Sequence, residues 1–376
     1  MLIAKAAVSR FLIVTIEIIV ALFLGMAIAS LSLGSIAWIF GGMGAGVLVI
    51  KVYQLISHKT FKSNKVGRKI GQAMVGLSIG FAIADSNLLA ASSRLPLFIF
   101  LTLFMLLCGG GIGYFYSRIS HTNLLNAMLA TVPGGVATMS GIAAEYNRNV
   151  SLVAMVQTLR ITSVVLIIPL IAGISDRHIK QDTLTLKDYA IPNDSSYLLL
   201  LILALIVAWG GVKIAGKLRI PAASFFGTLI VGIVFNSAIN YLPILDNIRF
   251  TPPQVISLIG QILLGITVGE AWSKRVNITS KNVVYAFISV AMTIASGFMA
   301  ATIATCFTSW DWLTCMLVTA PGGSTEMILV ALALNHNPEI VTVAHSVRLM
   351  ALNLSLPLWI FLFRRWEEKS STASLK

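Results

Sequence analysis

The stretch Thr131-Val132-Pro133-Gly134-Gly135 decides the fold, because the chain repeats it 188 positions later as Thr319-Ala320-Pro321-Gly322-Gly323. In both copies a Met follows four residues after the second Gly, as Met139 and Met327. Proline removes a backbone donor and glycine is a weak helix former, so Pro-Gly-Gly ends a helix. Both copies lie inside long apolar segments. The sequence therefore predicts one broken helix in each half of the chain.

An arginine follows each break at the same distance. Arg160 and Arg348 stand 27 residues after the respective Pro, surrounded by Ile, Val and Leu. An Arg near the middle of a bilayer costs roughly 3 kcal/mol or more unless it faces protein or water and has a partner. Two readings stay open. The arginines either pair inside the protein, with Glu145, with Glu326 or with carbonyls of the broken helix, or they clamp a carboxylate or another oxyanion.

The composition is that of an integral membrane protein. The chain has 376 residues, of which 57% are hydrophobic and 11% charged, with a mean hydropathy of +0.89. Apolar runs of about 20 residues, the length that spans the hydrocarbon core, recur from end to end. The net charge of +13 lies mostly in short loops, as the positive-inside rule expects. Membrane lipid is therefore an expected partner, and nucleic acid is not.

Twelve apolar segments are expected, six in each half. They are 11–33, 36–55, 70–90, 95–117, 122–145 and 150–174, then 195–212, 220–240, 252–273, 282–307, 310–335 and 339–363. Further matches link the halves: Gly71-Gln72 recurs as Gly260-Gln261, and Gly109 recurs as Gly297, at offsets of 189 and 188. A nearly constant offset indicates one ancestral unit that was duplicated. We expect a first membrane repeat at 1–174, a polar linker at 175–196, a second repeat at 197–364 and a cytoplasmic tail at 365–376.

The fold class expected is an all-α polytopic membrane protein with two inverted-topology repeats. Each repeat would have about five spans plus one Pro-Gly-Gly helix that is broken or re-entrant. Five crossings per repeat turn the second repeat upside down and place more loop Lys and Arg inside than twelve crossings do. Inverted repeats are a common plan of transporters. Both termini are then expected to be cytoplasmic, in a bacterial cytoplasmic (inner) membrane.

The two breaks have the chemistry expected of a binding site. Each new half-helix begins with free N–H groups and the positive end of its dipole, which attract an anion. One break can be a packing kink, but two at corresponding places in two repeats point to a transporter site. The expected substrate-binding residues are Pro133, Gly134, Gly135, Thr138, Arg160, Pro321, Gly322, Gly323, Ser324, Thr325 and Arg348.

Two ionisable residues near the second break have no ionisable counterpart near the first. Glu326 corresponds to Thr138, and His345, one helical turn before Arg348, corresponds to Gln157. We expect Glu326 and His345 to handle a coupling proton or cation. The alternatives are a fixed salt bridge to Arg348 for Glu326 and a hydrogen-bonded structural role for His345.

No metal site, cofactor or enzymatic centre is expected. The five His and three Cys residues are scattered, without metal-ligand spacing or a redox pair. No Walker motif follows the glycine-rich runs.

The Pro-Gly-Gly-x-x-x-Met element, the later Arg and the duplicated Gly-Gln element resemble the bacterial membrane AbrB family, built from the AbrB duplication repeat. The resemblance covers nearly the whole chain. Members carry labels such as AbrB family transcriptional regulator, regulator of aidB expression and ammonia monooxygenase, so the resemblance implies a family more firmly than an activity. At the level of fold alone, the broken helices in an inverted duplication are similar to elevator-type secondary transporters.

The function expected is secondary transport of a small anionic organic solute, coupled to protons or cations. Arg160 and Arg348 would hold or gate the anion between the two half-helix ends. A membrane-embedded regulator or sensor of gene expression is the alternative, and a monooxygenase component is a weaker one. A homodimer is expected by analogy with such folds.

Overall fold

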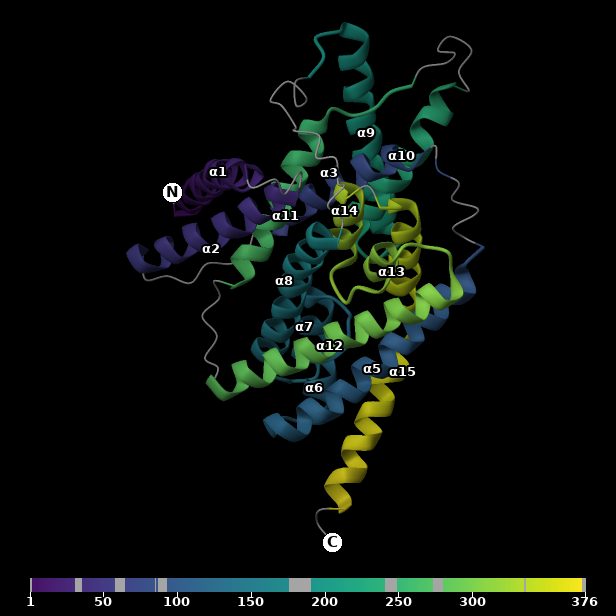
Figure 1. Cartoon of the computed structure of the whole chain (residues 1–376). Coiled ribbons are helices and arrows are strands. Elements are labelled where there is room, and N and C mark those ends of the chain that lie inside the picture. The colour runs from purple at the N-terminus through teal and green to yellow at the C-terminus, as the bar shows by residue number, and fades with distance from the viewer. Residues whose placement is uncertain are drawn as a thin grey trace. The chain divides into compact units, whose positions relative to one another are not determined.

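The computed structural model describes residues 2–30, 36–57, 65–84, 86, 93–175, 191–240, 249–272, 280–334 and 336–373. Over these ranges the chain forms fourteen α-helices and no strand (Figure 1). Most of the predicted linker lies outside the described residues. The two predicted breaks are present, since segments 122–145 and 310–335 each form two short helices instead of one long helix.

Nine of the described helices are long and apolar enough to cross a membrane. They are α1 (Leu2–Ala29), α2 (Ala37–Ser57), α5 (Leu95–Ser120), α8 (Val150–Ser175), α9 (Ser195–Lys217), α10 (Ala223–Asn240), α11 (Gln254–Trp272), α12 (Ser280–Phe307) and α15 (Pro338–Ala373). Large apolar side chains such as Phe23, Leu55 and Leu354 are exposed on them. Exposed apolar surface of this extent is suited to lipid, so the chain is a multi-span membrane protein.

One predicted segment is displaced in the structure. The apolar run at 70–90 was expected to be the helix, but α3 spans Lys65–Ala82. Its first turns contain Lys65, Arg68 and Lys69, which lower the hydropathy of the helix as a whole. The chain leaves the helix after Ala82, where it forms a turn at Ile83 and Ala84.

The helices form two compact units, each containing segments from both halves of the chain. Unit 1 comprises Met1–Ser86, Gly173–Arg275 and Leu332–Pro338, and so contains α1 to α3 and α9 to α11. Unit 2 comprises Asn87–Ala172, Val276–Ala331 and Glu339–Lys376. It contains α5, α8, α12 and α15 together with the short helices α6 (Leu124–Thr131), α7 (Val136–Glu145), α13 (Trp312–Thr319) and α14 (Ser324–Leu334).

In unit 1, helices from the two halves of the chain pack closely through glycines. On α2, Gly42 and Gly46 lie against Gly265 and Gly269 of α11, so that an added Cβ would meet backbone atoms. In the same way, Gly76 and Gly80 of α3 lie against the backbone of α10. Since α10 corresponds to α2 and α11 to α3, the second helix of each half packs on the third helix of the other. The same kind of glycine contact therefore occurs twice, with the roles of the two halves of the chain exchanged.

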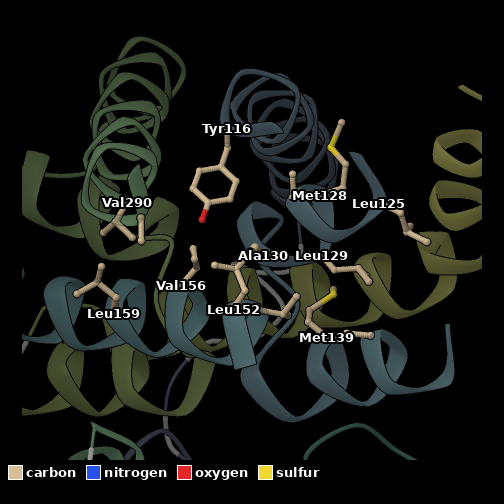
Figure 2. Packing of buried hydrophobic residues seen from close by; sticks show 14 of the residues in the cluster. Tyr116, Leu125, Met128, Leu129, Ala130, Met139, Leu152, Val156, Leu159 and Val290 are labelled. Carbon is tan, nitrogen blue, oxygen red and sulfur yellow. The ribbon is translucent and has the colours of Figure 1, made fainter. Parts of the chain in front are cut away.

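The core of unit 2 lies around the first break. Tyr116 of α5, Met128 of α6 and Met139 of α7 pack with Val156 of α8 and Val290 of α12 (Figure 2). Every one of these side chains is at least 97% buried. The core therefore fixes both halves of the broken helix α6–α7 against the long helices of its unit.

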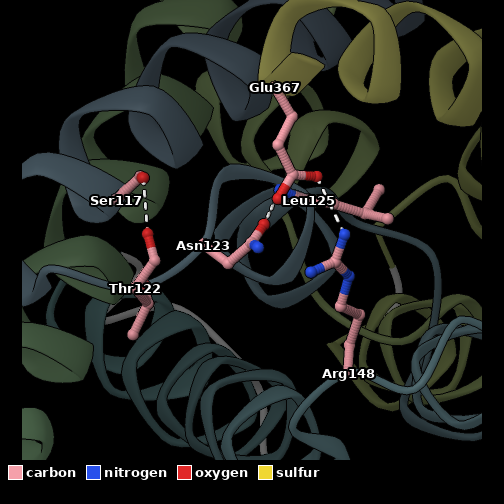
Figure 3. Close-up of polar contacts among 6 residues, drawn as sticks. All are labelled: Ser117, Thr122, Asn123, Leu125, Arg148 and Glu367. Carbon is pink, nitrogen blue, oxygen red and sulfur yellow. Dashed lines mark hydrogen bonds and ion pairs between the residues drawn. The ribbon is translucent and has the colours of Figure 1, made fainter. Parts of the chain in front are cut away.

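Side-chain caps mark the starts of the short helices α6 and α13, and Figure 3 shows the cap of α6. Asn123 caps α6 by accepting a hydrogen bond from the Leu125 N–H at 3.3 Å, and Asp311 caps α13 by accepting from the Thr314 N–H at 2.9 Å. Asn123 and Asp311 are 188 positions apart, so the caps correspond. After α7, an ion pair of 2.9 Å between Arg148 and Glu367 ties the next turn to α15.

Candidate functional site

Both Pro-Gly-Gly stretches are turns between two short helices, and in each the second glycine starts the new helix. Gly135 has φ 81° and ψ 141°, a conformation that essentially only glycine adopts. Its carbonyl accepts the first helical bond of α7 from the Met139 N–H at 3.0 Å, and the Gly323 carbonyl accepts from Met327 of α14 at 3.0 Å. The two Met residues that follow the motif at equal spacing are thus the first residues bonded into the new helices.

Each proline of the motif rests on a glycine of a long helix. A Cβ added at Gly109 of α5 would lie 3.3 Å from Cδ of Pro133, and one added at Gly297 of α12 would lie 2.9 Å from Cδ of Pro321. The threonine before each break reinforces the contact. Thr131 donates to the Gly109 carbonyl at 3.1 Å, and the corresponding Thr319 donates to the Gly297 carbonyl at 3.0 Å.

Arg160 and Arg348 donate hydrogen bonds to the carbonyl ends of the broken helices. Nη1 of Arg160 is 3.1 Å from the Thr131 carbonyl oxygen. Nη1 of Arg348 is 2.6 Å from the Ala320 carbonyl oxygen, and its Nη2 is 3.5 Å from that of Gly322. Carbonyls at the end of a helix lack intrahelical partners, and a cation there also interacts favourably with the dipole. Of the internal pairings considered from the sequence, the one with helix carbonyls is the one present.

Gln157 and His345 hold the two arginines. The Gln157 amide donates to the carbonyls of Leu129 and Val132, at 2.9 and 2.8 Å, and its oxygen accepts from Arg160 at 2.8 Å. His345 is bonded in the same way. Its Nε2 lies 2.9 Å from the Leu317 carbonyl oxygen, and its Nδ1 lies 2.6 Å from Nη2 of Arg348.

The hydrogen bonds of His345 define its tautomer. A carbonyl oxygen only accepts, so Nε2 carries the proton, and a guanidinium only donates, so Nδ1 is the acceptor. His345 is therefore a neutral imidazole in this arrangement, and a second proton on Nδ1 would displace the bond from Arg348.

The two buried arginines of unit 2 are compensated by helix-end carbonyls and not by a described carboxylate. Arg160 and Arg348 are 2% and 6% exposed, and both belong to unit 2. Within the described ranges, neither guanidinium has a carboxylate within 4 Å. Nε of Arg160 is also buried without a hydrogen-bond partner. Glu145, one pairing considered from the sequence, is exposed at the end of α7.

The other predicted site residues are more buried at the second break than at the first. At the second, Thr325 and Glu326 are 4% and 5% exposed, and the Glu326 carboxylate folds back over Gly323. Gly322 lies close to Val164 of α8, since an added Cβ would be 3.1 Å from its Cγ1. Ser324 is partly buried, whereas Thr138, the counterpart of Glu326, is exposed. The second break is the more enclosed of the two.

Some residues that build the site were not among the predicted site residues. From the sequence, Gln157 stands out only as the counterpart of His345, and Thr131 and Thr319 only as part of the motif. Their signal is the same offset of 188 that relates the prolines and arginines. Among the residues that the structure describes, no group of three or more His, Cys, Asp or Glu could hold a metal ion.

These observations define a class: a multi-span helical membrane protein with two corresponding broken helices, each held by a buried arginine. Within this class, the chain belongs to the AbrB family. The family described as "Transition state regulatory protein AbrB" matches residues 38–364.

Two curated relatives match most of the chain. The "Uncharacterized protein YhjN" of Bacillus subtilis (strain 168) is 24% identical over 344 residues, covering 89% of this chain and 88% of its own. The "Putative regulator AbrB" of Escherichia coli (strain K12) is 23% identical over 297 residues, covering 76% of this chain and 79% of its own. Both relatives are bacterial.

Proposed function

We propose that the protein is a secondary transporter of a small organic anion, coupled to a proton or cation, in the bacterial cytoplasmic membrane. The observation that carries the proposal is the pair Arg160 and Arg348. Both are buried in unit 2, and neither has a described carboxylate within 4 Å.

An anion would relieve the charge imbalance of this pair. Two like charges in a buried site repel each other far more strongly than in water, because the surrounding dielectric constant is low. Guanidinium groups bind carboxylates through planar, paired N–H donors. Arg160 has such a donor to spare, because its Nε is buried without a partner. The proposed ligand class is therefore a carboxylate of small size.

The half-helix ends support the same ligand class. Helices α7 and α14 both begin immediately after a break, at Val136 and Ser324. Their first N–H groups have no acceptor within the helix and carry the positive end of the dipole. Discontinuous helices that direct their N-termini at an anionic group are a recurring feature of transporter binding sites.

We further propose that the two repeats have inverted topology, with five spans and one broken helix each. Nine spans are recognised by length and hydropathy among the described residues, and α3 would be the tenth, as the counterpart of α11. The reciprocal packing of α2 on α11 and of α3 on α10 supports the pairing of the repeats.

We propose that Glu326, rather than His345, takes up the coupled proton or cation. The Glu326 carboxylate is 5% exposed at the first turn of α14, beside the second break. His345 is also buried, but both of its ring nitrogens are engaged. A proton taken up by His345 would therefore have to break its contact with Arg348.

Reconstitution into liposomes tests the transport proposal. Uptake of labelled mono-, di- and tricarboxylates is measured under an imposed proton or sodium gradient, for the wild type, Arg348→Ala and Arg365→Ala. Arg365 is the matched control because it is an exposed arginine on the same helix, α15. We expect gradient-driven uptake that Arg348→Ala abolishes and Arg365→Ala retains. Absence of uptake of every panel member, or equal uptake by both variants, would overturn the proposal.

A ligand-binding regulator is the second candidate, favoured by the description of the family and by the printed name of the Escherichia coli relative. The same site would then bind the anion without moving it. Binding without flux, together with a cytoplasmic protein that associates only with the ligand-bound form, would select this candidate.

A further inference from the structure

We propose that a cavity between α7 and α15 binds one phospholipid whose headgroup carries a phosphate and a primary ammonium group, as in phosphatidylethanolamine. The cavity has a volume of about 700 Å³ and lies within unit 2. Arg160 and Arg348 do not line it. The inference is therefore independent of the proposed transport, and we expect loss of the lipid to leave the binding of a small anion intact.

Apolar side chains form the wall of this cavity. Leu356, Pro357, Ile360 and Phe361 line it from α15, and Ile142 lines it from α7. Ile142 and Leu356 also pack against the buried core of unit 2, so that core fixes the wall in place. Phe361 is 59% exposed, so the cavity is open on the outer side of α15. A concave apolar wall that is open to the bilayer suits the acyl chain of a lipid.

Two opposite charges line the same cavity. Glu145 is the last residue of α7 and Arg365 belongs to α15, and both side chains are exposed. Neither forms an ion pair with a described residue, because the ion pair in this region joins Arg148 to Glu367 (Figure 3). That ion pair keeps the end of α7 beside α15. The cavity thus offers a carboxylate that accepts hydrogen bonds and a guanidinium that donates them.

Aromatic side chains indicate that the charged end of the cavity lies at the membrane surface. Tyr146 lines the cavity, and Trp366, which is 56% exposed, directly follows Arg365. Tyr and Trp are enriched where lipid headgroups meet the hydrocarbon. On the same helix, Leu354 and Leu358 are 83% and 60% exposed, as expected of a surface that contacts acyl chains. A lipid along α15 would therefore place its headgroup near the two charges and a chain on the apolar wall.

The two charges determine which headgroup is preferred. The wall contributes little to this choice, because the chains of all phospholipids are equally apolar. A guanidinium binds phosphate oxygens through paired N–H donors, and a carboxylate accepts from a primary ammonium group. An anionic headgroup would leave Glu145 unpaired, and a quaternary ammonium group has no N–H to donate. A headgroup with both a phosphate and a primary ammonium group pairs with both side chains.

Native mass spectrometry of the full-length, delipidated protein tests the headgroup preference. Phosphatidylethanolamine, phosphatidylcholine and phosphatidylglycerol with identical acyl chains are added in turn, and the lipid retained on the protein is measured. We expect the wild type to retain one phosphatidylethanolamine more strongly than either other lipid. Glu145→Gln should weaken its retention by about threefold or more, as expected when a solvent-accessible ion pair is removed. Equal retention of the three lipids by the wild type, or an unchanged preference in Glu145→Gln, would overturn the proposal.

Two tryptophan substitutions on α15 locate the lipid. Ile360→Trp would fill the cavity, whereas Leu358→Trp adds the same ring at a position that does not line it. We expect Ile360→Trp to lose the retained phosphatidylethanolamine and Leu358→Trp to keep it. Equal retention by the two variants would show that the lipid binds elsewhere. If Ile360→Trp does not fold, the comparison of Glu145→Gln with the wild type still decides the proposal.

The same spectra distinguish a lipid from two other occupants. Soluble phosphoethanolamine carries the headgroup without the chains, and we expect it to compete only weakly. Competition as strong as that of the whole lipid would show that the apolar wall takes no part. A dimer that binds no lipid and that Ile360→Trp dissociates would assign the cavity to a second copy of the chain. Either result would contradict a lipid site.

Discussion

Gln157 and His345, 188 positions apart, make the same two hydrogen bonds. Each donates to the carbonyl of the residue 28 positions earlier, and each accepts from the arginine three positions later. An amide and an imidazole serve one purpose here, because each offers an N–H donor and an acceptor on one flat group, although the amide of Gln157 also donates to the Val132 carbonyl. Both side chains position the buried arginines against the ends of the broken helices.

The first prediction follows from the matching hydrogen bonds of Gln157 and His345. His345→Gln should remain folded and nearly as stable as the wild type, because Gln157 shows that an amide can make both bonds. His345→Leu should lose about 1–3 kcal/mol, since it leaves a buried carbonyl and a buried guanidinium without a partner. Thermal unfolding of the purified variants in one detergent gives the comparison.

Transport by the same variants separates positioning from proton transfer. If His345→Gln keeps the proton dependence of uptake, His345 positions Arg348. If uptake continues but no longer responds to the proton gradient, His345 carries the proton, and the assignment of coupling to Glu326 is wrong.

The second prediction concerns the contact between each proline of the motif and a glycine of a long helix. Gly297→Ala should destabilise the protein by about 1–3 kcal/mol, because the added methyl group would press on the Pro321 ring and force a backbone shift. Gly109→Ala should have a smaller effect of the same sign, since its contact with Pro133 is longer. Gly111→Ala is the control, because a Cβ there has no neighbour within 4 Å. Equal melting temperatures for all three variants would show that the prolines are not held by these glycines.

The third prediction concerns the backbone at the first break. Gly135→Ala should lose about 1–3 kcal/mol, because its positive φ lies in a region that side chains disfavour. Gly141 lies within α7, where a Cβ would meet nothing within 4 Å. Gly141→Ala should therefore be neutral or stabilising by up to about 1 kcal/mol. Chemical unfolding of both variants supplies the test, and a loss at Gly141 equal to that at Gly135 would refute the argument from φ.

The fourth prediction concerns the proposed inversion of the repeats. His121 and Ser309 are exposed at the ends of the corresponding helices α5 and α12. In a background without native cysteines, His121→Cys and Ser309→Cys should react with a membrane-impermeant maleimide from opposite sides of the membrane. Labelling of both positions from the same side would show that the repeats are parallel.

Much of the architecture follows from the sequence. The positions of both breaks could be predicted because Pro-Gly-Gly acts locally on the backbone, and the spans because hydropathy measures the membrane environment directly. The pairing of α2 with α11 could not, because it depends on the fit of glycine surfaces between distant segments. Helix α3 was misplaced because its first turns are charged, so the apolar run and the helix do not coincide.

For the site, the sequence indicates the residues but not their hydrogen-bond partners. The motif and its offset indicated Arg160 and Arg348, but not that their first partners are the carbonyls of Thr131 and Ala320. Which alternative holds depends on side-chain reach after folding, and hydropathy carries no information on it.

The central claim is that both arginines contact one organic anion, and a double-mutant cycle on anion binding tests it most directly. Thermal stabilisation of the wild type, Arg160→Lys, Arg348→Lys and the double variant is measured against a panel of small carboxylates. We predict that at least one carboxylate stabilises the wild type, that each single variant weakens the effect, and that the two losses are not additive, as expected for residues sharing a ligand. No stabilisation by any carboxylate, or lysine variants that bind like the wild type, would contradict the account.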